Sequence, residues 1–126
     1  MFSDRPVIVL QLPVDLVAGT ARPFFNEIKS FLTVERPRVV FDLSAVARID
    51  SAGVQMLLNS MEEAMKRNGD LKLASVSTTA ITVLRLTRVD SLFEIFEHAA
   101  EAVDSFRQLP IPVFAATPEW VQTPTA

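Results

Sequence analysis

Apolar and polar residues follow two different periods along this chain. Short apolar runs that are rich in β-branched and aromatic residues, and bounded by proline or polar residues, are typical of buried strands. Longer segments in which apolar residues recur every three or four positions are typical of amphipathic helices. Runs of the first kind cover residues 7–12, 39–41, 71–76 and 92–96, and segments of the second kind cover residues 20–32, 51–67, 77–87 and 98–106.

Strands that alternate with helices are the pattern of an α/β layered domain. A chain of 126 residues is long enough for one hydrophobic core. We predict a single-domain mixed β-sheet of about four strands, flanked by about four helices, within residues 1–106. The run at residues 39–41 is expected in the interior of this sheet, because every residue in it is apolar.

The composition changes after Phe106. Residues 107–126 hold four of the eight prolines and the only tryptophan, and the prolines forbid a continuous helix. One interpretation is a Pro-rich, disordered C-terminal tail. The other is that the tail docks on its own domain or on a second copy in a homodimer, because Ile111, Val113, Phe114 and Trp120 are too apolar for a typical linker. We predict burial of Phe114 or Trp120.

The most informative stretch covers residues 38–67. Its buried strand ends in Asp42-Leu43-Ser44, and a short loop then leads to Asp50-Ser51-Ala52-Gly53 at the start of a helix. A helix N-terminus presents unpaired N–H groups and the positive end of the helix dipole, so it favours negative charge. We predict that Asp50 or Ser51 caps this helix, and a capping Ser51 would turn its hydroxyl toward the backbone donors. Asp42 is expected to accept backbone hydrogen bonds in the loop that follows it.

The helix after Gly53 has one apolar and one polar face. The polar face carries Gln55, Asn59, Glu62 and Lys66, and the apolar stripe carries Val54, Leu57, Leu58, Met61 and Met65. Met56 lies off this stripe. It is interpreted either as an exposed apolar contact for a partner or as a flexible filler of the core.

The composition argues against most catalytic chemistry. The chain has no cysteine and one histidine, and its three glycines form no phosphate-binding loop. A phosphoaspartate site at Asp42 would need acidic residues after the first strand to hold Mg²⁺, but that strand ends in Leu10-Gln11-Leu12-Pro13. We therefore expect no enzymatic activity, no metal and no cofactor.

The distribution of charge indicates protein partners. The net charge is −3, and the lysines and arginines are dispersed, whereas nucleic-acid-binding proteins concentrate positive charge. No apolar run approaches the ~18 residues of a membrane span, and the first residues have no signal-peptide pattern. We expect a cytoplasmic protein that binds no nucleic acid and has no membrane span.

The central stretch resembles the signature of a known family. Asp42-Leu43-Ser44 followed by Ile49-Asp50-Ser51-Ala52-Gly53-Val54 is similar to the signature of the STAS domain, which sulphate-transporter tails and bacterial anti-sigma factor antagonists share. The closing helix, strand and helix of that family resemble Leu84-Arg85-Leu86-Thr87, Leu92-Phe93-Glu94-Ile95-Phe96 and Ala99-Ala100-Glu101-Ala102. The resemblance implies a STAS-like fold over nearly all of the chain before the tail.

The resemblance also implies a function in partner switching, in which an antagonist binds an anti-sigma factor of serine-kinase ATPase fold and frees the sigma factor for transcription. The implied contact surface is the loop at residues 47–51 and the helix start, with Asp50, Ser51, Ala52, Gly53, Gln55, Met56 and Asn59. In phosphorylated antagonists the acceptor is the Ser or Thr directly before the glycine, where this chain has Ala52. Ser51 is then the remaining candidate acceptor, and the family's frequent second glycine is replaced by Gln55.

Two other functions stay open. STAS domains also serve as accessory subunits, for example on the ATPase of a bacterial lipid transporter, without serine phosphorylation, and Ala52 favours such an adaptor. The third hypothesis is an enzyme or small-ligand binder, which a ligand in a closed pocket would support. Between a phosphorylated and a constitutive binder, we predict the constitutive one.

Overall fold

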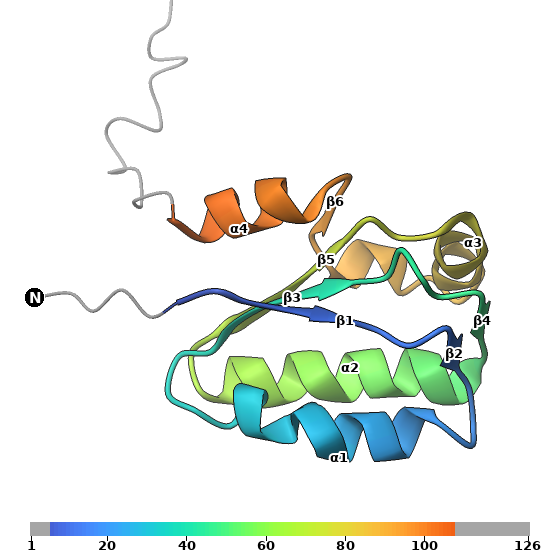
Figure 1. Ribbon diagram of the computed structural model, residues 1–126, viewed down its shortest axis with the longest axis horizontal. Coiled ribbons are helices and arrows are strands. Elements are labelled where there is room, and N and C mark those ends of the chain that lie inside the picture. The colour runs from blue at the N-terminus through green and yellow to red at the C-terminus, as the bar shows by residue number, and fades with distance from the viewer. Residues whose placement is uncertain (1–5, 108–126) are drawn as a thin grey trace, which may run out of the picture.

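The computed structural model describes residues 6–107, which form an α/β domain around a four-stranded sheet (Figure 1). The strand order is β1-β3-β5-β6, and every pairing in it is parallel. The strands are β1 (Ile8–Gln11), β3 (Arg38–Asp42), β5 (Asp70–Ala74) and β6 (Ile95–Phe96). The predicted fold class is confirmed, with four strands in this sheet and four helices in the described chain. The sheet is parallel where a mixed one was expected, because each connection between its strands is a crossover that contains a helix.

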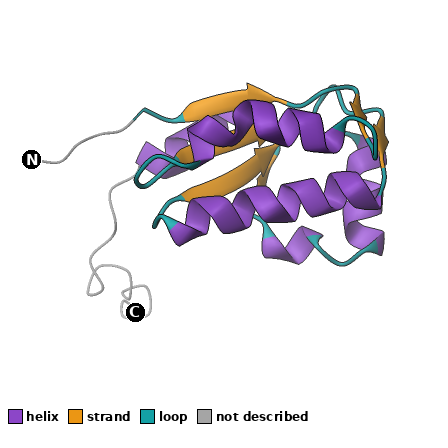
Figure 2. Ribbon diagram, turned by 90° about the horizontal axis from the view of Figure 1, so that it is seen from below, coloured by secondary structure: helices purple, strands orange, loops and turns teal. Residues whose placement is uncertain are grey.

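Helices cover both faces of the sheet. The helices are α1 (Ala21–Leu32), α2 (Ser51–Lys66), α3 (Thr78–Leu86) and α4 (Ala99–Arg107), with a 3₁₀ turn η1 (Asp90–Leu92) after α3. Helices α1 and α2 lie side by side on one face, and α4 lies on the other (Figures 1 and 2). Helix α3 packs against β4 and η1, away from the centre of the sheet.

The central strand β3 shows why both faces must be covered. Val39, Val40 and Phe41 are all fully buried, and β3 pairs with β1 on one side and β5 on the other. Val39 and Phe41 belong to the main core beneath α1 and α2, whereas Val40 packs with Ala74 and Ala102 beneath α4. Side chains of successive strand residues point to opposite faces, so an unbroken apolar run needs a helix layer on each. The predicted interior position of residues 39–41 is confirmed.

A second, two-stranded sheet was not expected from the sequence. Strands β2 (Asp15–Leu16) and β4 (Arg48–Ile49) pair in parallel, Asp15 opposite Arg48 and Leu16 opposite Ile49. Leu16 is fully buried. The short sheet lies at the end of the domain where α2 begins, and it holds the loop before that helix (Figure 1).

Candidate functional site

Asp50 caps helix α2 and also connects it to the loop after β2. Its Oδ1 accepts hydrogen bonds from the backbone N–H groups of Ala52 at 2.9 Å and Gly53 at 3.2 Å. Its Oδ2 accepts a third from the N–H of Ala18 at 3.1 Å. An aspartate at this position satisfies orphan donors of the first turn and places negative charge at the positive end of the helix dipole. The predicted cap is therefore confirmed, and it is Asp50.

Ser51 is the first residue of the helix and not its cap. Its side chain is exposed, and its hydroxyl makes no hydrogen bond within residues 6–107. The expectation that this hydroxyl would face the backbone donors is wrong, because the Asp50 carboxylate already accepts from them. Ala52, at the family's usual acceptor position, is half-buried and packs against the main core.

Gly53 lets the start of α2 approach β2 closely. A Cβ atom at this position would lie 2.1 Å from the backbone oxygen of Leu16 and 2.9 Å from the Ile49 side chain. Contacts this short would force the helix away from the small sheet. Gly53 therefore sets the distance between β2 and α2, and with it the shape of the surface at the helix start.

An exposed ion pair holds the outer side of the small sheet. Arg48 Nε and Nη2 donate to the two carboxylate oxygens of Asp15 at 2.8 and 2.9 Å. The hydrogen bond from Arg48 lowers the pKa of Asp15 below its ordinary value, and the same bond raises the pKa of Arg48. Thr20 Oγ1 donates to the Asp15 carbonyl at 2.6 Å, which fixes the turn into α1. Sequence reasoning missed this pair, because no periodic signal connects positions 33 residues apart.

The exposed side of α2 continues the surface away from its cap. Gln55 Nε2 donates to Asn59 Oδ1 at 3.0 Å, so these two side chains form one polar strip on the helix. Ala47, Asp50 and Ser51 are exposed before it. The structure thus brings most of the predicted site residues together on one end of the domain.

Met56 does not belong to that surface. It is only 3% exposed, so the interpretation as an exposed partner contact is wrong and the interpretation as a core filler is confirmed. Ser60, one turn later, is also buried, and its hydroxyl donates to the Met56 carbonyl at 2.8 Å. Met65, predicted in the apolar stripe, is 58% exposed. The buried stripe is shifted because α2 is enclosed both by the sheet and by α1.

Asp42 has the structural role predicted for it. Its Oδ1 accepts a hydrogen bond from the Ser44 N–H at 2.9 Å, a two-residue pattern that stabilises the turn after β3.

Within residues 6–107, no three side chains that bind metals gather into one cluster. In the same range, no helix is both long and apolar enough to cross a membrane.

The fold and this surface define an α/β module with an exposed, capped helix start beside a short second sheet. The chain matches the STAS domain family over residues 3–102. It belongs to that family.

Solved structures agree with this assignment. A protein of Thermotoga maritima described as an anti-sigma factor antagonist is 26% identical, with 81% of this chain and 88% of that one covered and a TM-score of 0.73. The anti-sigma factor antagonist SpoIIAA of Bacillus, unphosphorylated, shares the fold at 19% identity and TM-score 0.69, covering 87% and 96%. The STAS domain of a SulP transporter from Vibrio cholerae shares it at 15% identity and TM-score 0.62, covering 84% of each chain. The chain is thus a STAS domain that is similar to a protein described as an antagonist, and it shares its fold with a transporter domain.

Proposed function

We propose that this chain is a non-enzymatic, cytoplasmic regulatory module that binds a protein partner through the surface at the start of α2. The partner we propose is an anti-sigma factor of serine-kinase ATPase fold. Similarity to a protein described as an antagonist supports this choice. The exposure of Ala47, Asp50, Ser51, Gln55 and Asn59 on one end of the domain supports the surface.

One observation decides the kind of regulation we propose. The residue directly before Gly53 is Ala52, which has no hydroxyl, and Asp50 already supplies negative charge to the helix start. A phosphate on Ser51 would add about −1.5 to −2 charges next to the Asp50 carboxylate and meet like-charge repulsion. The proposed module therefore binds its partner constitutively and is controlled by expression or by another signal.

A matched pair of substitutions tests the proposed surface. Ala47 is exposed in the loop before β4, and Ala100 is exposed on α4, across the sheet. Ala47→Lys should weaken binding to the purified partner kinase at least tenfold, about 1.4 kcal/mol, because it places an unpaired charge in the contact. Ala100→Lys should leave affinity unchanged in the same calorimetric titration. Equal affinities of the two variants would show that the partner binds elsewhere on the domain.

Intact-mass analysis after incubation with the partner kinase and ATP tests the constitutive mode. We expect an unmodified chain that still binds its partner. A stoichiometric phosphate adduct that disappears in Ser51→Ala would overturn constitutive binding. Ala52→Ser restores a hydroxyl directly before Gly53, and modification of that variant alone would show that the kinase still recognises the surface.

An adaptor function is the second candidate, and Ala52 favours it. In this proposal the same surface binds the ATPase subunit of a transporter, and no serine needs to be modified. Affinity capture with the full chain, followed by mass spectrometry of the bound proteins, discriminates the two candidates. A kinase-type anti-sigma factor supports the first, and a transporter ATPase supports the second.

A further inference from the structure

The outer edge of β1 is an open edge of the main sheet. Strand β1 stands at one end of the strand order, so it pairs only with β3 within residues 6–107. The N–H of Leu12 donates to the Asp42 carbonyl at 2.9 Å, toward β3. Backbone groups alternate in direction along a strand, so Val7, Val9 and Gln11 present their N–H and C=O groups to the open side. An open edge of this kind is a template for another strand.

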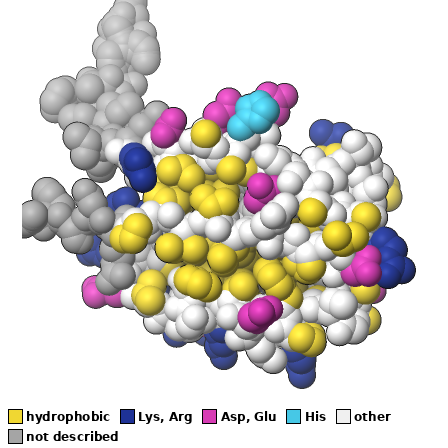
Figure 3. Space-filling model, viewed as in Figure 1, with side chains coloured by type: hydrophobic (Ala, Val, Ile, Leu, Met, Phe, Trp, Pro, Cys, Tyr) yellow, Lys and Arg dark blue, Asp and Glu magenta, His cyan; other side chains and the backbone are white. Residues whose placement is uncertain are grey.

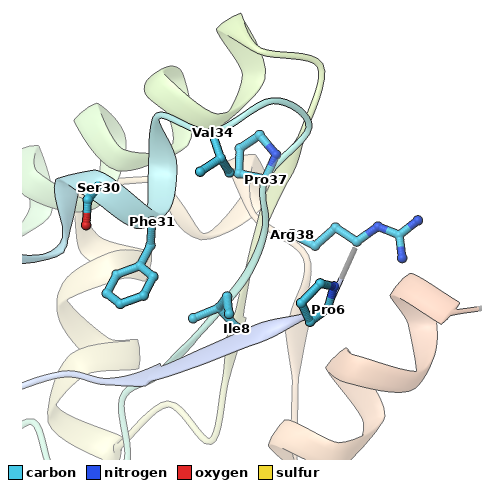
Figure 4. A pocket seen from close by; sticks show the side chains of 7 residues that line it. All are labelled: Pro6, Ile8, Ser30, Phe31, Val34, Pro37 and Arg38. Atoms are coloured by element: carbon cyan, nitrogen blue, oxygen red, sulfur yellow. The ribbon is translucent and has the colours of Figure 1, made fainter. Parts of the chain in front are cut away.

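Both sides of this edge are apolar. Val9 is 44% exposed beside α4, which packs mainly on β3, β5 and β6. On the other side, Ile8, Phe31 and Val34 line a cavity of about 150 Å³ beside the start of β1 (Figure 4). Hydrophobic side chains gather along the band between α4 and the pair α1–α2 (Figure 3). A contiguous apolar band along an open strand edge marks a site of association.

The chain itself returns to this edge. Helix α4 begins after β6, crosses β5 and β3, and ends at Arg107 near the end of the sheet where β1 starts (Figure 1). Its Phe106 packs against the same small cluster as Val7. Each extended residue spans about 3.3 Å, so a few residues after Arg107 suffice to reach β1. A strand that starts there runs parallel to β1.

The prolines of the C-terminal segment have the spacing that an edge strand requires. All four, Pro110, Pro112, Pro118 and Pro124, occupy positions of one parity. Proline has no N–H group and is accepted in a strand only where that group would face away from the sheet. In an extended strand whose Pro110 and Pro112 nitrogens face away from the sheet, the N–H groups of Ile111, Val113 and Ala115 would face toward it.

The direction of this connection obeys the handedness rule for parallel strands. The crossovers through α1 and α2 advance from β1 to β5 on one face of the sheet. A crossover through α4 lies on the opposite face and returns in the opposite direction. Reversing both the face and the direction preserves the hand of a crossover connection. The connection through α4 would therefore be right-handed, like those through α1 and α2.

We propose that residues 110–115 add to the outer edge of β1 as a fifth, parallel strand of the main sheet. Ile111, Val113 and Ala115 bond with the free backbone groups of β1, and their side chains share the face of Ile8 and Leu10, beside the cavity. Pro110, Pro112 and Phe114 cover Val9 on the other face. The outward prolines then close the sheet against further strands, so this edge is not the partner surface.

Hydrogen exchange of the full chain, followed residue by residue by NMR, tests the proposal. Within residues 6–107, the amides of Val9 and Gln11 have no acceptor, so slow exchange of both requires an added strand. Ala115→Pro removes an inward N–H and should speed their exchange by about tenfold, the effect of one lost backbone hydrogen bond. Ala116→Pro is the matched control, because its N–H faces outward, and it should have no effect. The Leu12 amide, bonded to Asp42, should stay protected in both variants.

Three results would overturn the proposal. Unprotected exchange of Val9 and Gln11 in the full chain would show that no strand covers the edge. Equal effects of Ala115→Pro and Ala116→Pro would contradict the parity on which the pairing depends. Protection that disappears on dilution would show that a second copy of the chain, and not its own C-terminal segment, occupies the edge.

Discussion

Gly53 shows how a missing side chain can shape a surface. Its backbone lies so near the Leu16 carbonyl that no Cβ fits between the helix and the small sheet. Gly19, in the loop before α1, has open space around the same position and an ordinary backbone conformation. Substitution by alanine should therefore affect the stability of the domain at Gly53 and not at Gly19.

We predict that Gly53→Ala destabilises the domain and that Gly19→Ala does not. Overpacking at Gly53 must displace backbone, which costs about 1–3 kcal/mol. Gly19→Ala should be neutral or stabilise by about 0.4–1 kcal/mol, because it restricts the unfolded chain. Urea unfolding measures both free energies. A Gly53→Ala variant as stable as the native protein would mean that β2 and α2 do not pack as closely as described.

The Asp15–Arg48 pair predicts a pH dependence of stability. Arg48 lowers the pKa of Asp15 in the folded protein. The pair's contribution is therefore complete above the unfolded-state pKa, about 3.9, and is lost as the pH falls through the folded pKa. Arg48→Gln should make the urea midpoint less sensitive to acidification between about pH 6 and pH 3.

Arg85→Gln is the control for that experiment. Arg85 is exposed on α3 and makes no ion pair within the described residues. Its variant should keep the native acid sensitivity. If Arg48→Gln keeps it as well, other carboxylates, such as Glu63 with its pKa lowered by Arg67, account for the acid response.

At the scale of elements, one buried lysine joins the apolar cluster of Val40, Ala74 and Ala102 in attaching α4 to the sheet. Lys72 lies in β5, is 7% exposed, and donates from Nζ to Ser105 Oγ at 2.6 Å. The same Nζ lies 3.1 Å from the Glu94 carboxylate and 4.3 Å from the centre of the Phe106 ring. The stem of the side chain fills space between strand and helix while its charge is satisfied at the rim.

We predict that Lys72→Ala loosens α4. The loss of the hydrogen bond, the ring contact and the packed stem should lower the free energy of unfolding by about 1–3 kcal/mol. Lys66→Ala is the control, because Lys66 makes only an exposed pair with Glu63, and exposed pairs contribute little to stability. Hydrogen exchange within α4 should accelerate only in the Lys72 variant. Unchanged exchange within α4 of the Lys72 variant would show that the apolar contacts of Ala102 and Val103 hold the helix on the sheet without the lysine.

At the scale of the whole molecule, our two proposals concern different parts of the domain. The end with the small sheet carries the proposed partner surface, and the edge of β1 lies beside the end of α4. The expected burial of Phe114 or Trp120 falls outside residues 6–107 and stays a prediction, as does the boundary at residue 106. Both concern the last residues of the chain.

We predict that a chain ending at Arg107 has a lower melting temperature or an altered oligomeric state. A loss of about 1 kcal/mol shifts the midpoint of a domain this size by about 4–8 °C. Calorimetry gives the midpoint, and light scattering gives the molecular mass. If neither changes on truncation, residues 108–126 contribute nothing to the fold.

Local features were predictable from the sequence by itself. The buried run at residues 39–41, the Asp50 cap and the turn at Asp42 depend on neighbouring residues, through side-chain alternation and short-range hydrogen bonds. The alternation of strands and helices likewise indicated the α/β class, because each period is a property of one segment.

Only the tertiary structure decided how these segments share their faces. Met56 is buried and Met65 is exposed because α2 packs against both α1 and the sheet. The periodicity of one helix does not show which other elements will pack against it. Asp15 meets Arg48 because β2 and β4 pair, and Gly53 is required because Leu16 lies against it. These contacts join residues that are 33 or more positions apart, so their geometry exists only once the chain has folded.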